Sequence, residues 1–224
     1  MNRLIVAADV ADASAAEDLA RRLTGAAGML KVGLELFTAE GPSAVHRVRT
    51  HLPVFLDLKL HDIPTTVGRA ARSAGRLGVS MLTVHALGGE AMVAAAVEGA
   101  GEGADEAGGE PPKVVAVTVL SSLAEAAGAS PASLAFEARS AGATGAVVSG
   151  DHVREVREAL GEELTLVVPG IRPSAAGAND HARVLTPAEA LEKGADLLVV
   201  GRPITAASDP AGAARAILRE MGEA

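Results

Sequence analysis

Short apolar runs alternate with Ala-rich helical stretches along the whole chain. The runs are rich in Val, Ile and Leu, which is typical of buried parallel strands. Several helical stretches begin with a capping residue followed by proline, as at Ser130-Pro131 and Thr186-Pro187, a common helix start. The expected strands are residues 4–9, 29–33, 54–59, 80–85, 114–120, 145–150, 164–170 and 196–203, and the expected helices are residues 12–23, 41–50, 64–77, 89–99, 131–142, 151–160, 186–193 and 208–222.

Eight strands that alternate with eight helices predict an α/β protein, a single (β/α)8 TIM barrel domain over residues 1–224. An open doubly wound sheet would alternate in the same way, but the Gly-x-Gly-x-x-Gly fingerprint of dinucleotide binding is missing after the first strand. The Gly/Glu-rich stretch 99–113 is expected to be a surface loop before the fifth strand. Residues 174–180 are expected to be a flexible loop on the strand-to-helix side, where barrel active sites lie.

Composition narrows the class of function. With 49% hydrophobic and 21% charged residues, the chain is not a disordered one. A net charge of −8, with three Phe and no Tyr or Trp, argues against a nucleic-acid partner. The absence of Cys excludes disulfides, thiolate nucleophiles and Cys-ligated metals. The N-terminal apolar run ends at Asp9 and no stretch is long enough to span a membrane, so we expect a cytoplasmic protein.

Charged residues interrupt the apolar runs near the carboxyl ends of the first three strands: Asp9, Lys31, Asp57, Lys59 and Asp62. In a strand, alternation puts Asp57 and Lys59 on the face opposite the flanking leucines, inside the barrel mouth. Buried charges must be paired, and nearby carboxylates favour the protonated, proton-donating form of a lysine. The alternatives are a purely structural Asp57–Lys59 pair, solvated strand ends at Asp9 and Lys31, and a helix cap at Asp62.

A phosphate site is expected after the last two strands. Gly201 and Arg202 follow the eighth strand, and Arg172 lies in the loop after the seventh, the loops that often bind phosphate in barrels. Arginine offers a bidentate fork to phosphate, although two surface arginines remain the alternative. The six histidines show no metal-binding spacing. We expect structural roles for His61 and for a hydrogen-bonded His85.

The string Asp57-Leu-Lys-Leu-His-Asp-Ile-Pro-Thr-Thr66 resembles the signature of the orotidine 5′-phosphate decarboxylase family. Segments 30–42, 84–89, 116–122, 167–173 and 199–205 also resemble that family in order and spacing. The resemblance covers essentially the whole chain. It implies a carboxy-lyase that converts orotidine 5′-phosphate to UMP and CO2 in de novo pyrimidine biosynthesis, with no cofactor and no metal.

The resemblance also implies roles for the charged residues. Lys59 would protonate C6 of the pyrimidine as CO2 leaves, and Asp57 would lie beside the substrate carboxylate. Lys31 and Asp62 would complete an alternating network of lysines and aspartates. Asp62 and Thr66 would be contributed by the partner subunit of a homodimer.

Further substrate contacts follow from the same resemblance. His181 stands where the family usually has a glutamine that bridges base and phosphate, and histidine donates one hydrogen bond when neutral and two when charged. The other implied contacts are Asp9 and Lys31 to the ribose, Ser121 or Ser122 to the pyrimidine, Pro169 in the pocket wall, and Arg172, Gly201 and Arg202 to the phosphate.

Two rival functions share these features. A magnesium-dependent sugar-phosphate decarboxylase or hexulose-phosphate synthase would need further acidic ligands, for which Glu35 is a candidate. A noncatalytic phosphate-binding barrel would bind a nucleotide without turning it over.

Overall fold

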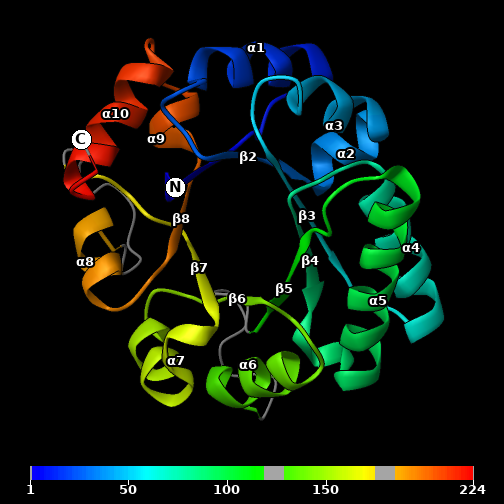
Figure 1. Ribbon diagram of the computed structural model, residues 1–224. Helices are drawn as coiled ribbons and strands as arrows, with labels where there is room; N and C mark the ends of the chain where they lie inside the picture. The colour runs from blue at the N-terminus through cyan, green and yellow to red at the C-terminus, as the bar shows by residue number, and fades with distance from the viewer. Residues whose placement is uncertain (1, 119–128, 175–184, 224) are drawn as a thin grey trace.

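The computed structural model describes residues 2–118, 129–174 and 185–223. Eight parallel strands pair in sequence order, and β8 pairs with β1 to close a barrel (Figure 1). The predicted single (β/α)8 barrel is therefore confirmed, and the open doubly wound sheet is excluded. The strands are β1 (Leu4–Ala7), β2 (Met29–Gly33), β3 (Val54–Leu60), β4 (Met81–His85), β5 (Lys113–Val117), β6 (Gly145–Val147), β7 (Thr165–Pro169) and β8 (Leu197–Val200).

The helices form an outer ring around the strands (Figure 1). Two begin with the caps that the sequence predicts: the side chain of Ser130 accepts the N–H of Ser133, and Thr186 forms a capping box with Glu189. The helices are α1 (Ala13–Leu23), α2 (Leu34–Glu40), α3 (Pro42–Val48), α4 (Pro64–Arg76), α5 (Glu90–Ala107), α6 (Pro131–Ser140), α7 (Val153–Leu160), α8 (Pro187–Glu192), α9 (Arg202–Thr205) and α10 (Pro210–Glu220), with short 3-10 turns η1 (Ala86–Gly88) and η2 (Gly161–Glu163).

The prediction of a surface loop over residues 99–113 is wrong for its first nine positions, because α5 continues to Ala107. Glycines in this part of α5 let its backbone approach α4, which lies beside it (Figure 1). A Cβ on Gly99 would lie 2.2 Å from the carbonyl oxygen of Gly68, and one on Gly103 would lie 1.9 Å from that of Arg72. These glycines therefore belong to a tight helix contact.

Two short helices were not expected. α2 follows β2 directly and ends at Glu40, before Gly41, whose φ of 58° lies in the left-handed region, where glycine meets no steric penalty. α9 occupies residues that the pattern assigned to the eighth strand and the loop after it. Each is too short to show a helical period in the sequence.

Alternate residues of the strands form two apolar layers. The outer layer packs between the strands and the helix ring. The inner layer fills the barrel interior, so the barrel is a packed core rather than a pore. The residues of the inner layer are Ile5, Ala7, Met29, Phe55, Met81, Val115, Val167, Leu197 and Val199, with Val147 packed against them. Among the described helices, none combines the length and the apolar character needed to cross a membrane.

Candidate active site

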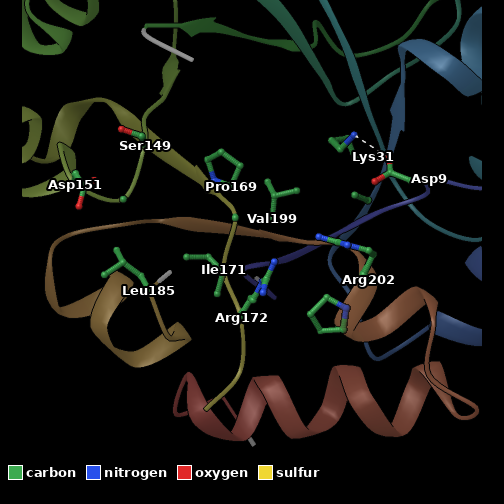
Figure 2. Close-up of a pocket in the computed structure, with 15 residues that line it drawn as sticks. Asp9, Lys31, Ser149, Asp151, Pro169, Ile171, Arg172, Leu185, Val199 and Arg202 are labelled. Atoms are coloured by element: carbon green, nitrogen blue, oxygen red, sulfur yellow. Dashed lines mark ion pairs between the residues drawn. The ribbon is translucent and has the colours of Figure 1, made fainter. Parts of the chain in front are cut away.

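A cavity of about 450 Å3 opens at the carboxyl ends of the strands. Its described lining comes from the ends of β1, β2 and β6 to β8 and from the residues that follow them (Figure 2). A deeper recess of about 90 Å3 continues into the barrel and is lined by Lys31, Asp57 and Lys59 above the inner apolar layer. Four of the five charged residues expected near strand ends, Asp9, Lys31, Asp57 and Lys59, thus line these two spaces, which share Lys31, Pro169 and Val199.

Four of the charged residues form an alternating chain in that space. Lys31 Nζ lies 3.7 Å from Asp9 Oδ1, an ion pair drawn in Figure 2, and 3.5 Å from Asp57 Oδ2. Lys59 Nζ donates to both carboxylate oxygens of Asp57, at 2.8 Å and 2.9 Å. The side chains of Asp57 and Lys31 are only 12% and 13% exposed, whereas that of Asp9 is 62% exposed. The network therefore runs from the solvent edge into the barrel.

The backbone at Lys59 is unusual. Its φ is 50°, the one positive value for a non-glycine residue in the part of the chain that the structure describes. The pairing of β3 with β4 shifts there: Leu56 pairs with Leu82, but the next pair is Leu60 with Val84, which is a bulge in β3. Lys59, with its positive φ, lies within this shift in register. Such a conformation costs about 1–3 kcal/mol and persists where the surroundings hold it.

The expected phosphate residues meet at the other end of the cavity. Arg172 follows β7, Gly201 and Arg202 follow β8, and these two strands are neighbours. In Figure 2 both guanidinium groups extend into the cavity. A Cβ on Gly201 would lie 3.6 Å from Asp9 Oδ2, so a side chain there would project beside the charged network. Among the described residues, neither arginine forms an ion pair with a carboxylate.

Asp62 and Thr66 do not line this cavity in the chain that carries them. Both are exposed at the start of α4, and Asp62 Oδ1 accepts the N–H of Ile63 at 2.7 Å. The N-cap of α4 is Ile63 and no side chain caps it, so the helix-cap alternative for Asp62 is wrong. Their side chains are left accessible.

The two histidines beside β3 and β4 stack on each other. The rings of His61 and His85 have centroids 5.1 Å apart and an interplanar angle of 22°. Within the described residues the buried Nδ1 of His85 has no hydrogen-bond partner, so the expectation of a hydrogen-bonded His85 is wrong for this atom. Burial lowers the pKa of His85, and the nearby His61 and Lys59 lower it further.

Pro169 lines both the cavity and its deeper recess, as expected. Ser121, Ser122 and His181 lie outside the described residues. Sequence reasoning did not single out Ser149 and Asp151, which line the cavity after β6. Their signal was a polar residue at the carboxyl end of an apolar run, the same signal that identified Asp9.

Glu35 lines a side recess of about 110 Å3 together with Asp9, Lys31, Asp57 and Lys59. Over the described ranges, no group of three or more His, Asp or Glu side chains is arranged to hold a metal ion.

Comparisons with known proteins place the chain in a family. Residues 2–217 match the model of the "Orotidine 5′-phosphate decarboxylase / HUMPS family". The chain is 53% identical to orotidine 5′-phosphate decarboxylase from Anaeromyxobacter sp. (strain K), covering 96% of each chain. It is 50% identical to that from Moorella thermoacetica, covering 98% of this chain and 92% of the relative.

A solved structure extends the comparison to the fold. The crystal structure of orotidine 5′-phosphate decarboxylase from Lactobacillus acidophilus superposes with a TM-score of 0.84 at 36% identity, over 99% of both chains. Sequence and fold agree, and the chain belongs to the orotidine 5′-phosphate decarboxylase / HUMPS family.

Proposed function

We propose that this protein decarboxylates orotidine 5′-phosphate to UMP and CO2 without a cofactor, with Lys59 as the acid that protonates C6. The observation that carries the proposal is the position of the Lys59 ammonium. It is held by both oxygens of Asp57 in the deep recess of a cavity, and Arg172 and Arg202 lie along the same cavity. A substrate with a phosphate at one end and a reacting carboxylate at the other fits that separation of charges.

The reaction needs a group that stabilises a carbanion. The bond between C6 and the carboxyl carbon breaks, CO2 leaves, and the electron pair stays on C6. The Lys59 ammonium then gives one proton to C6, and solvent restores the lysine. A fixed cation next to the developing negative charge supplies electrostatic stabilisation as well as the proton.

Asp57 has a second role in this proposal. Its carboxylate would lie beside the carboxylate of the substrate, and the repulsion between the two is relieved when CO2 departs. Such ground-state destabilisation is one recognised source of rate enhancement. The partial burial of Asp57 supports this role, because charges repel more strongly where water is excluded.

The rest of the substrate would be bound by the cavity. Arg172, Gly201 and Arg202 would hold the phosphate, Asp9 and Lys31 the ribose hydroxyls, and Pro169 would contact the base. Binding energy from the phosphate, remote from the reacting carbon, can be used to align C6 with Lys59. The pyrimidine contacts of Ser121 or Ser122 and the phosphate contact of His181 stay predictions from the sequence.

We also propose a homodimer in which Asp62 and Thr66 complete the partner's site. Two observations support it. Both residues are exposed, although the alternating network in one chain ends at Lys59. Exposed apolar side chains lie after the carboxyl ends of three neighbouring strands: Leu34 at 55%, Ile63 at 66% and Leu87 at 45% exposed. A contiguous apolar patch marks an interaction site, and we propose that these three side chains belong to the dimer interface. A cytoplasmic location stays a prediction from the sequence.

Replacement of Lys59 tests the proposed acid. Lys59→Ala is expected to lower kcat by about 100-fold or more, the usual contribution of a positioned proton donor, with thermal unfolding close to that of the unmodified protein. Lys113→Ala is the matched control, because Lys113 is exposed at the opposite end of β5. Substantial turnover of orotidine 5′-phosphate by Lys59→Ala would remove Lys59 from this role.

A further inference from the structure

Thr83 lies opposite the bulge that carries Lys59. It sits on β4 between Leu82 and Val84, the two residues that pair with β3 on either side of the bulge. Its side chain is completely buried. By alternation with the outward-facing Leu82 and Val84, Thr83 faces the barrel interior. A buried hydroxyl among apolar residues calls for hydrogen-bond partners.

Both partners of Thr83 belong to the catalytic pair. Its Oγ1 accepts the backbone N–H of Lys59 at 2.8 Å and donates to Asp57 Oδ1 at 3.0 Å. A hydroxyl has one proton, and the bond to Asp57 uses it. The hydroxyl therefore accepts from the Lys59 backbone and donates to the carboxylate that binds the Lys59 ammonium. One side chain links the strained backbone of Lys59 to the ion partner of its side chain.

We infer that Thr83 is a positioning residue, which holds the Lys59 ammonium in its reactive place by bonding both the bulge and Asp57. Without the hydroxyl, the Lys59 N–H loses its partner at a backbone conformation that is unfavourable for a side-chain-bearing residue. Asp57 loses one of the bonds that orient its carboxylate. The lysine stays present but its ammonium is no longer fixed. This inference rests on the proposed roles of Lys59 and Asp57.

Thr83→Val tests it, because valine has the shape of threonine without the hydroxyl. We expect kcat for orotidine 5′-phosphate to fall by about 10- to 100-fold, since a misplacement of about 1 Å can cost that much. The Kd for UMP should stay within about threefold, because the proposed phosphate and ribose contacts do not involve Thr83. Thr83→Ser keeps the hydroxyl and should restore most of kcat.

Thr118→Val is the matched control. Thr118 is also completely buried, and its hydroxyl donates to the carbonyl oxygen of Val147 at 3.0 Å. This variant loses a buried hydrogen bond without touching Lys59 or Asp57, so it should keep kcat within about threefold. If Thr83→Val does not fold, Thr83→Ala replaces it in the same comparison with Thr83→Ser.

The outcomes separate this inference from the proposed function. An unchanged kcat in Thr83→Val, an equal loss in Thr118→Val, or no rescue by Thr83→Ser would each overturn the role of Thr83. Lys59→Ala, assayed alongside, reports on the acid itself. If Lys59→Ala is inactive while Thr83→Val is fully active, only the inference about Thr83 fails. If Lys59→Ala is active, the proposed acid fails first.

Discussion

The ammonium of Lys59 lies within hydrogen-bond distance of both carboxylate oxygens of Asp57, although only Leu58 separates the two residues on β3. The contact lies where β3 bulges and the backbone of Lys59 is left-handed. A preorganised cation requires little rearrangement when negative charge develops beside it. Lys31 Nζ lies 3.5 Å from Asp57 Oδ2, so two cations lie next to this carboxylate.

Arg202→Ala should slow the reaction because it removes a proposed contact to the phosphate of the substrate. We expect kcat/KM for orotidine 5′-phosphate to fall by about 10- to 100-fold, since a hydrogen bond to a charged group is worth about 1.5–3 kcal/mol. For the nucleoside orotidine, which lacks the phosphate, the same variant should react as slowly as the unmodified protein. Steady-state kinetics with both substrates make the comparison. An equal loss with orotidine would show that Arg202 does not act on the phosphate.

Mixing two inactive variants tests the shared site. Lys59→Ala and Asp62→Ala homodimers should each be inactive. In a mixed dimer one of the two sites has both natural residues, so random exchange of equal amounts should restore up to about a quarter of the activity. Exchange is verified by native mass spectrometry of differently tagged subunits. No recovery after verified exchange would mean that each site is built within one chain.

The contact between α4 and α5 should not tolerate a side chain at Gly103. A Cβ there would lie 1.9 Å from the carbonyl oxygen of Arg72, so Gly103→Ala must move a helix backbone. Overpacking of this kind costs about 1–3 kcal/mol of the free energy of unfolding.

Gly101→Ala is the control in the same helix. A Cβ at Gly101 meets nothing within 4 Å, and alanine in a helix is favoured over glycine by about 0.5–1 kcal/mol. Urea unfolding of both variants should therefore give changes of opposite sign. Equal effects would contradict the close approach of the two helices.

The strands could be predicted from sequence because buried parallel strands leave a strong mark, a short β-branched run. The helix contact could not. Gly99 and Gly103 look like loop residues, and only the nearby backbone of α4 explains them. Tertiary packing therefore overrode local composition, and the predicted end of α5 came before its actual end at Ala107.

The charged residues of the candidate site could be predicted from the sequence, but their detailed geometry could not. Asp57 and Lys59 were expected on one face by simple alternation and do contact each other, but the bulge at Lys59 was not foreseen. Thr83 was part of an apolar run, and its one visible signal was a polar residue at an inward position. The inferred positioning role of Thr83 depends on two hydrogen bonds to another strand, and no local sequence pattern predicts such bonds.

His85 should make stability depend on pH. Its pKa in the folded state is lowered from 6.5, first by burial and then by His61 and Lys59. The unfolded chain therefore binds a proton at this residue before the folded chain does, and the free energy of unfolding falls as pH drops below about 6.5. Above that pH both states hold His85 neutral and the effect vanishes.

Urea unfolding at pH 8 and at pH 5.5 measures this dependence. His85→Asn should lose less stability between the two pH values than the unmodified protein, because it lacks the proton uptake of His85 on unfolding. The other histidines are present in both proteins and contribute equally. Identical pH slopes would show that His85 titrates normally in the folded state.

The most direct test of the central claim is the loss of orotidine 5′-phosphate absorbance on addition of the purified protein in the presence of EDTA. Cofactor-free catalysis by the Lys59–Asp57 pair predicts rapid conversion to UMP at the same rate with and without the chelator. No turnover, or turnover that appears only when magnesium is restored, would contradict it and would favour metal-assisted chemistry on a sugar phosphate.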